Sequence, residues 1–311
     1  MENENAAGGG NPSASQTQSP IDERLQKLLD KALYAGGSPI AQAIRNFLNG
    51  TWLGEPLHVI LTDIPIGAWT VALIFDGLDV MQHERAYAKA ADSAIAIGLL
   101  GAAAAATTGW TDWSDVDPPA RRGGMWHGLL NASATVLYAS SLIFRKRRRR
   151  ISGRVYAALG YSVMLFAARL GGDMVYKYRV GVDRTSGQAF PEDFVTVMPE
   201  AELQNDKPVR AEHTGVPILL VRRGDRVFAM AETCSHFGAP LSEGKLDGDS
   251  IVCPWHASRF ALLDGHVING PAVHPQPCLE ARIRNGNIEI RKSNSDLPES
   301  GLESLTPAAA K

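Results

Sequence analysis

The chain has 311 residues, which is long enough for two domains, and its formal net charge is −2. A nearly neutral chain gives no general sign of nucleic-acid binding. Its three cysteines, Cys234, Cys253 and Cys278, are too few and odd in number for a disulfide framework. Metal ligation is therefore the first use we expect for them.

The two ends of the chain are predicted to be disordered tails, over residues 1–20 and 293–311, because both are polar. The start of the chain has neither a basic segment nor an apolar run, so we expect no secretory signal there. Residues 21–50 are predicted to form two amphipathic helices, the second beginning at Ser38-Pro39. These helices either lie along a membrane surface or pack on a neighbouring domain.

Residues 57–172 contain four apolar stretches, and a helix that crosses a membrane needs about 20 mainly apolar residues. We therefore expect an α-helical transmembrane bundle of four spans. The alternative, a soluble alanine-rich bundle, is unusual for four such lengths in succession. The first stretch is the weakest candidate, because Asp63, Asp76 and Asp79 would be unfavourable in lipid unless they face the bundle interior. The stretches are residues 57–80, 93–111, 125–144 and 151–172.

The most basic turn lies between the third and fourth stretches, where residues 145–150 read RKRRRR and Arg154 follows. Positively charged turns stay in the cytoplasm, so four spans would place both ends of the chain on the outer face of the membrane. A nucleic-acid patch is a poor interpretation of a run that lies between two apolar helices. We expect a multi-pass protein of the bacterial plasma membrane, with the lipid bilayer as a partner and no nucleic acid.

Residues 173–191 are predicted to be a linker, and residues 192–292 to be an all-β domain of antiparallel strands. VPILLVRRGDRVFAMAE indicates a hairpin that turns at Gly224, and LEARIRNGNIEIR indicates a second hairpin that turns at Asn285-Gly286. The membrane bundle is therefore followed by a small β domain of about 100 residues.

Two loops of the predicted β domain contain one cysteine and one histidine each. ETCSHFGAPL carries Cys234 and His236, and CPWHASRF carries Cys253 and His256. Cys-x-His followed by Cys-x-x-His is the ligand order of a Rieske [2Fe–2S] centre, in which two thiolates hold one iron and two imidazoles hold the other. Zinc also binds two cysteines and two histidines, but zinc fingers usually pair like residues, whereas each loop here is mixed.

The stretch from CSHFGAPLSEGKLDGDSIVCPWHASRF to GPAVHPQPC resembles the Rieske ferredoxin family almost from end to end. The resemblance implies a single-electron carrier with a Rieske-type [2Fe–2S] cluster, whose two histidines lie at an exposed tip that faces the redox partner. It also implies that Ser258 donates its hydroxyl to a bridging sulfide. The other residues expected around the cluster are Gly238, Pro254, Trp255, Gly270 and Pro271, the last two in a Gly-Pro-Ala loop over the cluster.

The chain departs from the quinol-oxidising members of that family. Those members carry an extra cysteine in each loop, joined as a disulfide, whereas this chain has Ala239 and Trp255 in these places. Phe260 stands where the high-potential members have a tyrosine, which removes a hydrogen-bond donor to a ligand thiolate. Fewer hydrogen bonds to sulfur lower the potential, so we predict an intermediate value.

The remaining cysteine and histidines of the β domain have no ligand spacing. We expect Cys278 to be a small buried residue. His213, His266 and His274 are predicted to be surface or loop residues.

PLHVILTDIPIGAW, at residues 56–69, begins a segment that resembles an uncharacterised four-helix bacterial membrane family often fused to Rieske domains. No activity follows from this resemblance. In the predicted topology, His58 and His127 lie at similar depth near the outer ends of the first and third spans. Two histidines on facing helices bind haem b from both sides, and the alternative is a pair of polar residues at the membrane interface.

The leading hypothesis is a membrane-anchored Rieske protein that carries single electrons between a membrane or quinone-linked donor and an unknown acceptor. We expect a redox partner protein or quinone, and no catalysis by the chain itself. The alternatives are a ferredoxin-like component of a Rieske oxygenase system and a redox-sensing membrane protein whose cluster regulates the bundle. An oxygenase would need a mononuclear iron site on a long following domain, whereas about 20 residues follow the last predicted strand.

Overall fold

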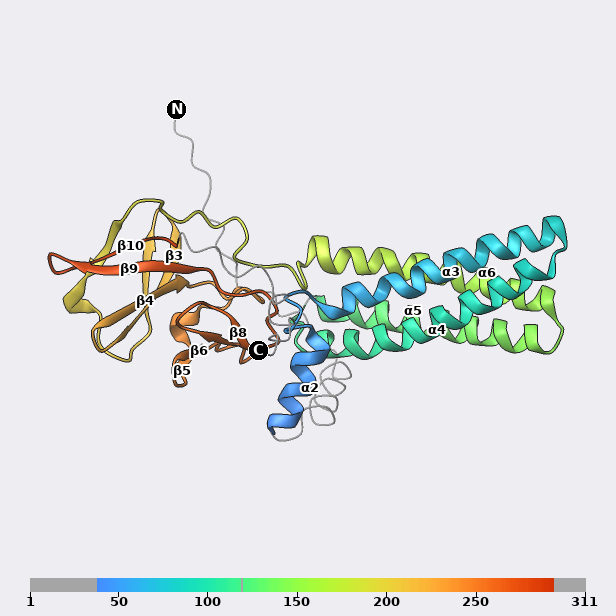
Figure 1. Cartoon of the computed structure of the whole chain (residues 1–311), viewed down its shortest axis with the longest axis horizontal. Coiled ribbons are helices and arrows are strands. Elements are labelled where there is room, and N and C mark those ends of the chain that lie inside the picture. Colours follow the sequence, from blue (N-terminus) through green and yellow to red (C-terminus); the bar gives the residue numbers. More distant parts are fainter. Residues whose placement is uncertain (1–37, 119, 294–311) are drawn as a thin grey trace, which may run out of the picture.

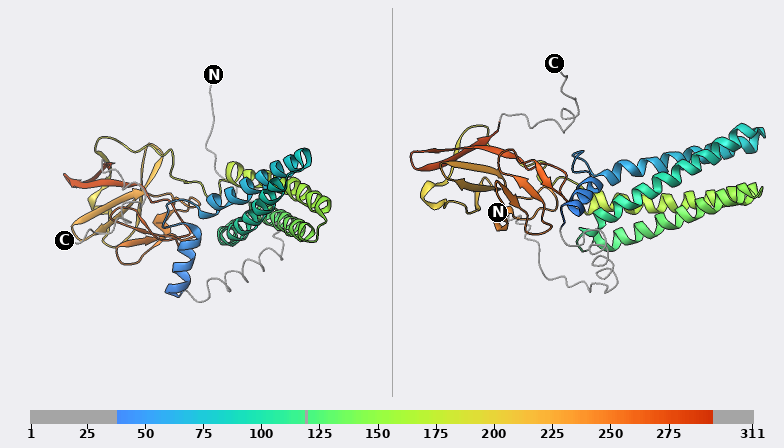
Figure 2. Two further views of the ribbon diagram at one scale, coloured as in Figure 1. Left: turned by 45° about the vertical axis from the view of Figure 1, so that its right-hand side comes forward. Right: turned by 60° about the horizontal axis from the view of Figure 1, so that its bottom comes forward.

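The computed structural model describes residues 38–118 and 120–293, and it places a four-helix bundle and a β domain end to end (Figure 1). Almost all of both predicted tails, and the predicted helix before Ser38, lie outside the described residues. The bundle begins and ends beside the β domain, so its two hairpin turns lie at the far end (Figures 1 and 2). The bundle helices are α3 (Leu57–Gln82), α4 (Arg85–Ser114), α5 (Ala120–Lys146) and α6 (Arg150–Gly172).

The second predicted amphipathic helix is α2 (Pro39–Asn49), which leaves the junction between the domains at a steep angle to the bundle (Figures 1 and 2). Ser38 caps it, since its Oγ accepts a hydrogen bond from the Ala41 N–H at 3.2 Å. Its Asn46 side chain binds the β domain, while the apolar side chains of Ile40 and Phe47 remain exposed. This helix therefore packs on a neighbouring domain through one face, which is one of the two expected roles, and it exposes an apolar face.

Three helical segments of the bundle are long and apolar enough to cross a membrane: α3, α4, and α6 continued by the π-helical turn Asp173–Lys177. Among the described residues α5 does not qualify, although it has 27 residues, because His127, Asn131 and several serines dilute its apolar character. The prediction of four spans therefore counts one too many. The ranking of the first stretch as weakest is also wrong, because Asp76 and Asp79 lie in the last two turns of α3 and the rest of the helix carries one carboxylate, Asp63, so that its hydropathy is the highest of the three.

The two helical hairpins, α3–α4 and α5–α6, are related by an internal repeat. Adding 69 to positions 65, 69, 72 and 76 of α3 gives positions 134, 138, 141 and 145 of α5, and all eight residues are buried. Adding 62 to positions 91, 95, 98 and 105 of α4 gives positions 153, 157, 160 and 167 of α6, again all buried. Equivalent residues also meet: the ring of Trp69 stacks on that of Tyr138 at 4.0 Å between centroids. The hairpins therefore pack about a pseudo-two-fold axis.

An ion-pair network closes the far end of the bundle. The buried Arg145 guanidinium donates to Asp76 at 2.8 Å and to Asp92 at 3.0 Å. Pairing offsets the desolvation that isolated charges would suffer in an apolar bundle. The aspartates of α3 that the network contains thus face the bundle interior, which is the condition under which they are tolerated in a membrane domain. The network consists of Asp76, Asp79, Asp92, Arg145, Arg150 and Arg154.

The β domain has a six-stranded antiparallel sheet, in the order β1-β10-β9-β4-β3-β2, and a four-stranded sheet, in the order β5-β6-β7-β8. Both predicted hairpins are present, with turns at Gly224-Asp225 and Asn285-Gly286, where three of the four residues adopt the left-handed backbone that such turns need. The larger sheet contains β1 (Val195–Pro199), β2 (Val209–His213), β3 (Val216–Arg223), β4 (Arg226–Ala231), β9 (Cys278–Arg284) and β10 (Asn287–Lys292). The smaller sheet contains β5 (Lys245–Leu246), β6 (Ser250–Val252), β7 (Arg259–Ala261) and β8 (Val267–Asn269).

Strand β3 is buried on both faces, so the larger sheet contributes to two cores. Leu219 and Val221 point into a core shared with the smaller sheet, and this core also contains Cys234 and Cys253. Ile218 and Leu220 point into a second core on the opposite face. The predicted metal-binding cysteines are therefore held between the two sheets.

Candidate metal centre and its docking face

Two loops with the same turn carry the predicted metal ligands. The first loop follows β4, and there the Cys234 N–H donates to the Ala239 carbonyl and the Gly238 N–H donates to the Cys234 carbonyl, at 2.8 and 2.9 Å. The second loop, between β6 and β7, repeats the pattern, with Cys253 bonded in the same way to Ser258 and Ala257. Both turns contain a residue with positive φ, Gly238 at +84° and Ala257 at +58°. Each turn therefore closes around one cysteine and one histidine.

The two cysteine side chains meet in the core. Cys234 is fully buried and Cys253 is 4% exposed. The Cys234 thiol donates a hydrogen bond to the neighbouring Cys253 sulfur, and this bond, together with burial, raises the pKa of Cys234, while the same bond lowers the pKa of Cys253 to about 7. Backbone N–H groups of Trp255 and His256 also favour a thiolate at Cys253. One thiolate is thus already favoured here, as a metal ligand requires.

The two histidines lie on the bundle side of the cysteines. The rings of His236 and His256 have centroids 5.1 Å apart and are nearly perpendicular, at 88°. Burial lowers the pKa of His236 well below its usual value, so its ring is neutral, and its buried Nδ1 has no hydrogen-bond partner in the described part of the chain. An imidazole bound at about 2.0 Å has its centroid about 3.2 Å from the metal, so a tetrahedral pair has centroids about 5 Å apart. The observed spacing fits two imidazoles on one metal ion.

The four side chains suit two metal ions better than one. The two cysteine sulfurs pair with each other in the core, and the two imidazoles pair with each other on the bundle side. A tetrahedral zinc site would bring all four donors to one point, whereas a two-iron cluster needs a sulfur pair on one side and a nitrogen pair on the other. The donor set therefore fits a [2Fe–2S] cluster.

Other predicted residues surround the ligand loops. Ser258 is fully buried, and its Oγ accepts a hydrogen bond from the Ala272 N–H at 2.9 Å, which leaves its hydroxyl hydrogen to donate. Gly270 and Pro271 are buried next to Ala272, so the Gly-Pro-Ala loop packs against the second ligand loop. Pro254 and Trp255 lie on the exposed side of their loop, with Trp255 53% exposed.

The linker after the bundle holds the first ligand loop in place. The Arg184 N–H donates to the Ser235 carbonyl at 2.9 Å, and the Arg184 guanidinium lies 5.6 Å from the ring centroid of Phe237. Gln188 donates to the Thr233 hydroxyl at 3.0 Å. Because the linker joins the two domains, these contacts tie the ligand loop to the end of the bundle.

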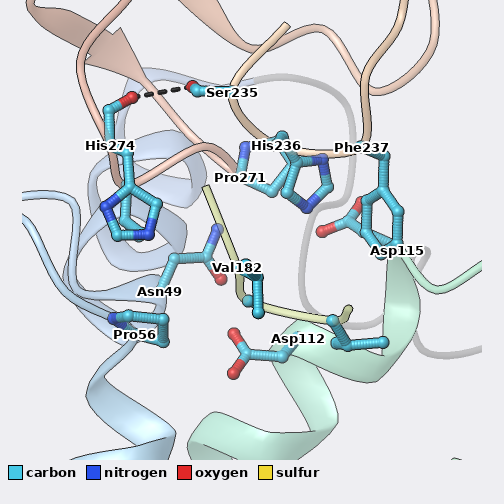
Figure 3. Close-up of a pocket in the computed structure, with 13 residues that line it drawn as sticks. Asn49, Pro56, Asp112, Asp115, Val182, Ser235, His236, Phe237, Pro271 and His274 are labelled. Atoms are coloured by element: carbon cyan, nitrogen blue, oxygen red, sulfur yellow. Dashed lines mark hydrogen bonds between the residues drawn. The ribbon is translucent and has the colours of Figure 1, made fainter. Parts of the chain in front are cut away.

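The histidine edge of this site is seated on the bundle and is not an exposed tip, contrary to the expectation from the family. His256 is 16% exposed, and its Nε2 lies 3.8 Å from Asp117 Oδ2 in the connection between α4 and α5. Asn46 of α2 accepts a hydrogen bond from the Gly270 N–H at 3.0 Å. A cavity of about 40 Å³ lies between His236 and Asp112 of α4 (Figure 3). We call these contacting surfaces the docking face.

Sequence reasoning missed the docking face. His274, predicted to be a surface or loop residue, lines the cavity beside His236 (Figure 3). Asn49 and Asp112 line it from the bundle side. A polar Asn49 next to the glycine that ends α2, and an aspartate at the end of an apolar helix, were the available signals, but neither has ligand spacing. By contrast His266 is exposed and Cys278 is partly buried against the shared core, much as expected.

The structure also brings together the predicted haem ligands. The rings of His58 and His127 have centroids 6.5 Å apart, at 90° to each other, near the starts of α3 and α5 and so at the end of the bundle nearest the docking face. They form a second pair of facing imidazoles, separate from the pair on the ligand loops.

Comparison with known proteins matches both parts of the chain. A family model described as the Rieske [2Fe-2S] domain matches residues 193–280, and a model of predicted membrane proteins (DUF2231) matches residues 54–184. Ferredoxin CarAc of Metapseudomonas resinovorans is 36% identical over 74 residues, which are 24% of this chain and 69% of the relative. The ferredoxin subunit of 3-phenylpropionate/cinnamic acid dioxygenase of Escherichia coli K12 is 34% identical over 102 residues, which are 32% of this chain and 91% of the relative.

Two further likenesses cover the same region. Apoptosis-inducing factor 3 of Mus musculus is 29% identical over 109 residues, but these are only 18% of that protein. Among solved structures, the ferredoxin of carbazole 1,9a-dioxygenase from Nocardioides aromaticivorans IC177 is 27% identical, with a TM-score of 0.31, over 33% of this chain and 100% of that chain. The β domain is an iron–sulfur electron carrier, and it is joined to a DUF2231 membrane domain. Through this β domain the chain belongs to the Rieske [2Fe-2S] ferredoxin family.

Proposed function

We propose that the chain is a membrane-anchored Rieske protein that exchanges single electrons with its own membrane domain across the docking face. The observation that carries this proposal is the position of the histidine edge. His236 and His256 face Asp112 and Asp117 of the bundle, so the edge from which a Rieske cluster exchanges electrons is turned toward the bundle.

We assign Cys234 and Cys253 as the ligands of one iron, and His236 and His256 as the ligands of the other. When bound, the cluster supplies one-electron oxidation and reduction at a potential raised by its neutral imidazole ligands. The protein residues do the rest. The ligand-loop turns orient the side chains, Ser258 offers a hydroxyl hydrogen toward sulfur, and the two β sheets exclude water from the cysteines.

The surface of the bundle supports anchoring in a bilayer. Along its length it exposes large apolar side chains, among them Ile74, Leu100 and Phe166. A soluble protein seldom exposes so much contiguous apolar surface. Near the docking face the exposed residues include Trp52, Trp110 and Trp126, the residue type that concentrates at membrane interfaces.

We place the β domain on the outer face of the plasma membrane. Residues 146–149, which read KRRR, are exposed at the far end of the bundle, and basic residues favour the cytoplasm. Trypsin added to sealed right-side-out vesicles should then cut the β domain and spare residues 146–149. Cleavage only after the vesicles are opened would place the β domain in the cytoplasm.

A second candidate comes from the relatives, whose names assign them to carbazole and 3-phenylpropionate dioxygenase systems. A ferredoxin of that kind would pass its electrons to a separate oxygenase. The covered histidine edge favours the bundle as the electron partner, because a soluble partner would first have to displace it. The cavity at this edge, about 40 Å³, is also far smaller than the few hundred Å³ of ordinary small-molecule sites, so a quinone has no room there without movement.

The test is EPR spectroscopy of the reduced full-length protein in detergent. We expect a Rieske-type signal that disappears in Cys234→Ser and in His256→Ala. His266→Ala is the matched control, because the side chain of this exposed histidine of the same domain bonds to Asp264 and not to the ligand loops, and it should leave the signal unchanged. One zinc per chain without inorganic sulfide in the wild type would refute the assignment.

A further inference from the structure

His58 and His127 meet inside the bundle at the end nearest the Rieske domain. His58 lies in the first turn of α3, and His127 lies seven residues after the start of α5. Adding 69 to position 58 gives position 127, the same shift that relates the buried residues of α3 to those of α5. The two histidines are therefore equivalent in the internal repeat and meet at its pseudo-two-fold axis.

Each histidine is held by the second helix of its own hairpin. Nδ1 of His58 lies 2.8 Å from the Ala105 carbonyl of α4, and Nδ1 of His127 lies 2.9 Å from the Ala167 carbonyl of α6. Ala105 and Ala167 are themselves equivalent in the repeat. Since a carbonyl only accepts, each Nδ1 carries the proton and each Nε2 keeps its lone pair. This is the arrangement in which a histidine ligates a metal through Nε2.

Glycines give the two rings the space they occupy. A Cβ at Gly109 of α4 would lie 2.6 Å from His58, and a Cβ at Gly171 of α6 would lie 3.0 Å from His127. Gly109 follows Ala105 by four residues and Gly171 follows Ala167 by four residues, so this feature is repeated as well. Both hairpins thus combine a histidine, a carbonyl acceptor and a glycine in the same geometry.

The distance between the rings fits axial ligation. Imidazoles on opposite sides of one metal, each bound at about 2.0 Å, have centroids about 6.4 Å apart. The observed separation is 6.5 Å, with the rings perpendicular, whereas the cluster histidines have the shorter spacing of a tetrahedral pair. The separation of the rings of His58 and His127 thus matches that of two imidazoles on opposite sides of one metal.

The polar neighbour of this pair is Asn131, one turn after His127. Its Nδ2 lies 3.1 Å from Nε2 and 3.5 Å from Nδ1 of His127, and 3.0 Å from the His127 carbonyl oxygen. An atom on the lone-pair axis of Nε2 would be much farther from Nδ1 than from Nε2. Asn131 therefore sits beside the ring and leaves that axis open.

We propose that His58 and His127 are the axial ligands of a b-type haem held between the two hairpins. In the described part of the chain, no third His, Cys, Asp or Glu joins the pair, so the protein supplies two ligands on opposite sides of the metal. Zinc takes three or four protein ligands, whereas haem iron takes its other four from the porphyrin. The helix positions that flank the rings are glycine and alanine, so no large side chain of α4 or α6 stands beside the rings at these positions.

The haem would be the electron partner of the cluster, and this part of the inference rests on the proposed function. Asp112, which lines the cavity beside His236, follows Gly109 by three residues in α4. Three helical residues span about 4.5 Å, so less than one turn of α4 separates the docking face from the His58 ring. Haem binding itself does not depend on the cluster.

The test is visible and EPR spectroscopy of the full-length protein, purified in detergent from haem-replete cells. We expect about one low-spin haem for each [2Fe–2S] cluster, with the strongly anisotropic ferric signal of perpendicular imidazoles. His58→Ala and His127→Ala should each lower the haem content at least tenfold and keep the Rieske signal. His83→Ala, in the exposed turn between α3 and α4, is the matched control and should retain the haem.

Two further variants keep the outcomes distinct. If the alanine variants fail to accumulate, His127→Met should keep a haem with a changed axial ligand, seen as a shifted spectrum and a raised haem potential. Cys234→Ser should remove the Rieske signal and leave the haem, so failure of the cluster assignment is separate. The proposal would be overturned if the wild-type protein held the cluster and no haem, or if haem persisted in both alanine variants. It would also be overturned if copper were bound in place of haem.

Discussion

Replacing Phe260 by tyrosine should raise the reduction potential of the Rieske cluster. Phe260 is fully buried on β7, two residues after Ser258, and packs in the same core as Cys234 and Cys253. A hydroxyl placed at this position lies in the same cluster of packed side chains as the two cysteine ligands, and the resemblance to the high-potential members implies that it donates to one of their thiolates. It would stabilise the reduced, more negative cluster more than the oxidised one.

The size of this effect follows from the energy of one hydrogen bond. A hydrogen bond to a charged group contributes about 1.5–3 kcal/mol, but it forms in both oxidation states, so only part of that energy enters the potential. A difference of about 1 kcal/mol corresponds to about 40 mV for one electron. We therefore expect Phe260→Tyr to raise the potential by about 40 mV, and Ser258→Ala to lower it by a similar amount.

The assay is a potentiometric titration of the full-length protein in detergent, followed by the EPR signal of the reduced cluster. Phe228→Tyr is the matched control, because Phe228 is only partly buried against the same core and should change the potential little. The added oxygen in a packed core costs about 1–3 kcal/mol of stability, so the cluster content is measured alongside. An unchanged or lowered potential in Phe260→Tyr, with a full cluster signal, would refute the reasoning.

Three other predictions concern the bundle, the third cysteine and the docking face. Arg145→Gln should destabilise the protein by about 3 kcal/mol or more, because it leaves buried carboxylates without their partner. The measurement is thermal unfolding, and Lys146→Gln, at the exposed neighbouring position, should show no comparable loss of stability. Burial raises the pKa of Cys278 to about 12, so iodoacetamide at pH 8 should label it slowly until the protein is unfolded, and rapid labelling of the native protein would contradict this. Asn46→Ala removes the acceptor of the Gly270 N–H, so hydrogen–deuterium exchange of that amide should accelerate about tenfold, and an unchanged rate would show that the contact does not hold the loop.

Much of the molecule followed from local sequence patterns. The long apolar stretches indicated the helices of the bundle, because apolar length is a property of consecutive residues. The hairpin turns at Gly224 and Asn285-Gly286 were predicted because turn chemistry depends on two neighbouring residues. Whether α5 counts as a membrane-spanning helix was harder to judge. Its polar residues are spread among apolar ones, so they lower its hydropathy without interrupting the helix.

The internal repeat was hard to see in the sequence because it preserves residue type at only some positions, such as His58 and His127, and elsewhere preserves only packing. Trp69 corresponds to Tyr138, and Asp76 corresponds to Arg145, so equivalent residues differ in identity or even in charge. What they share is burial at the pseudo-two-fold axis, where each packs against its own counterpart. Only the positions of the helices in space reveal that relation.

The sequence by itself determined the candidate ligands and the chemistry they suit. Each ligand loop is a short turn in which a cysteine and a histidine lie three or fewer positions apart, so both side chains must face the same metal cluster. Only the tertiary structure decided that this cluster site faces the helical bundle. The contacts of His256 with Asp117, and of Gly270 with Asn46, join residues more than 100 positions apart, and no pattern within either segment specifies its partner. The covered histidine edge and the facing pair of His58 and His127 depend on how whole helices and sheets pack, so they became visible only once the two domains were placed together.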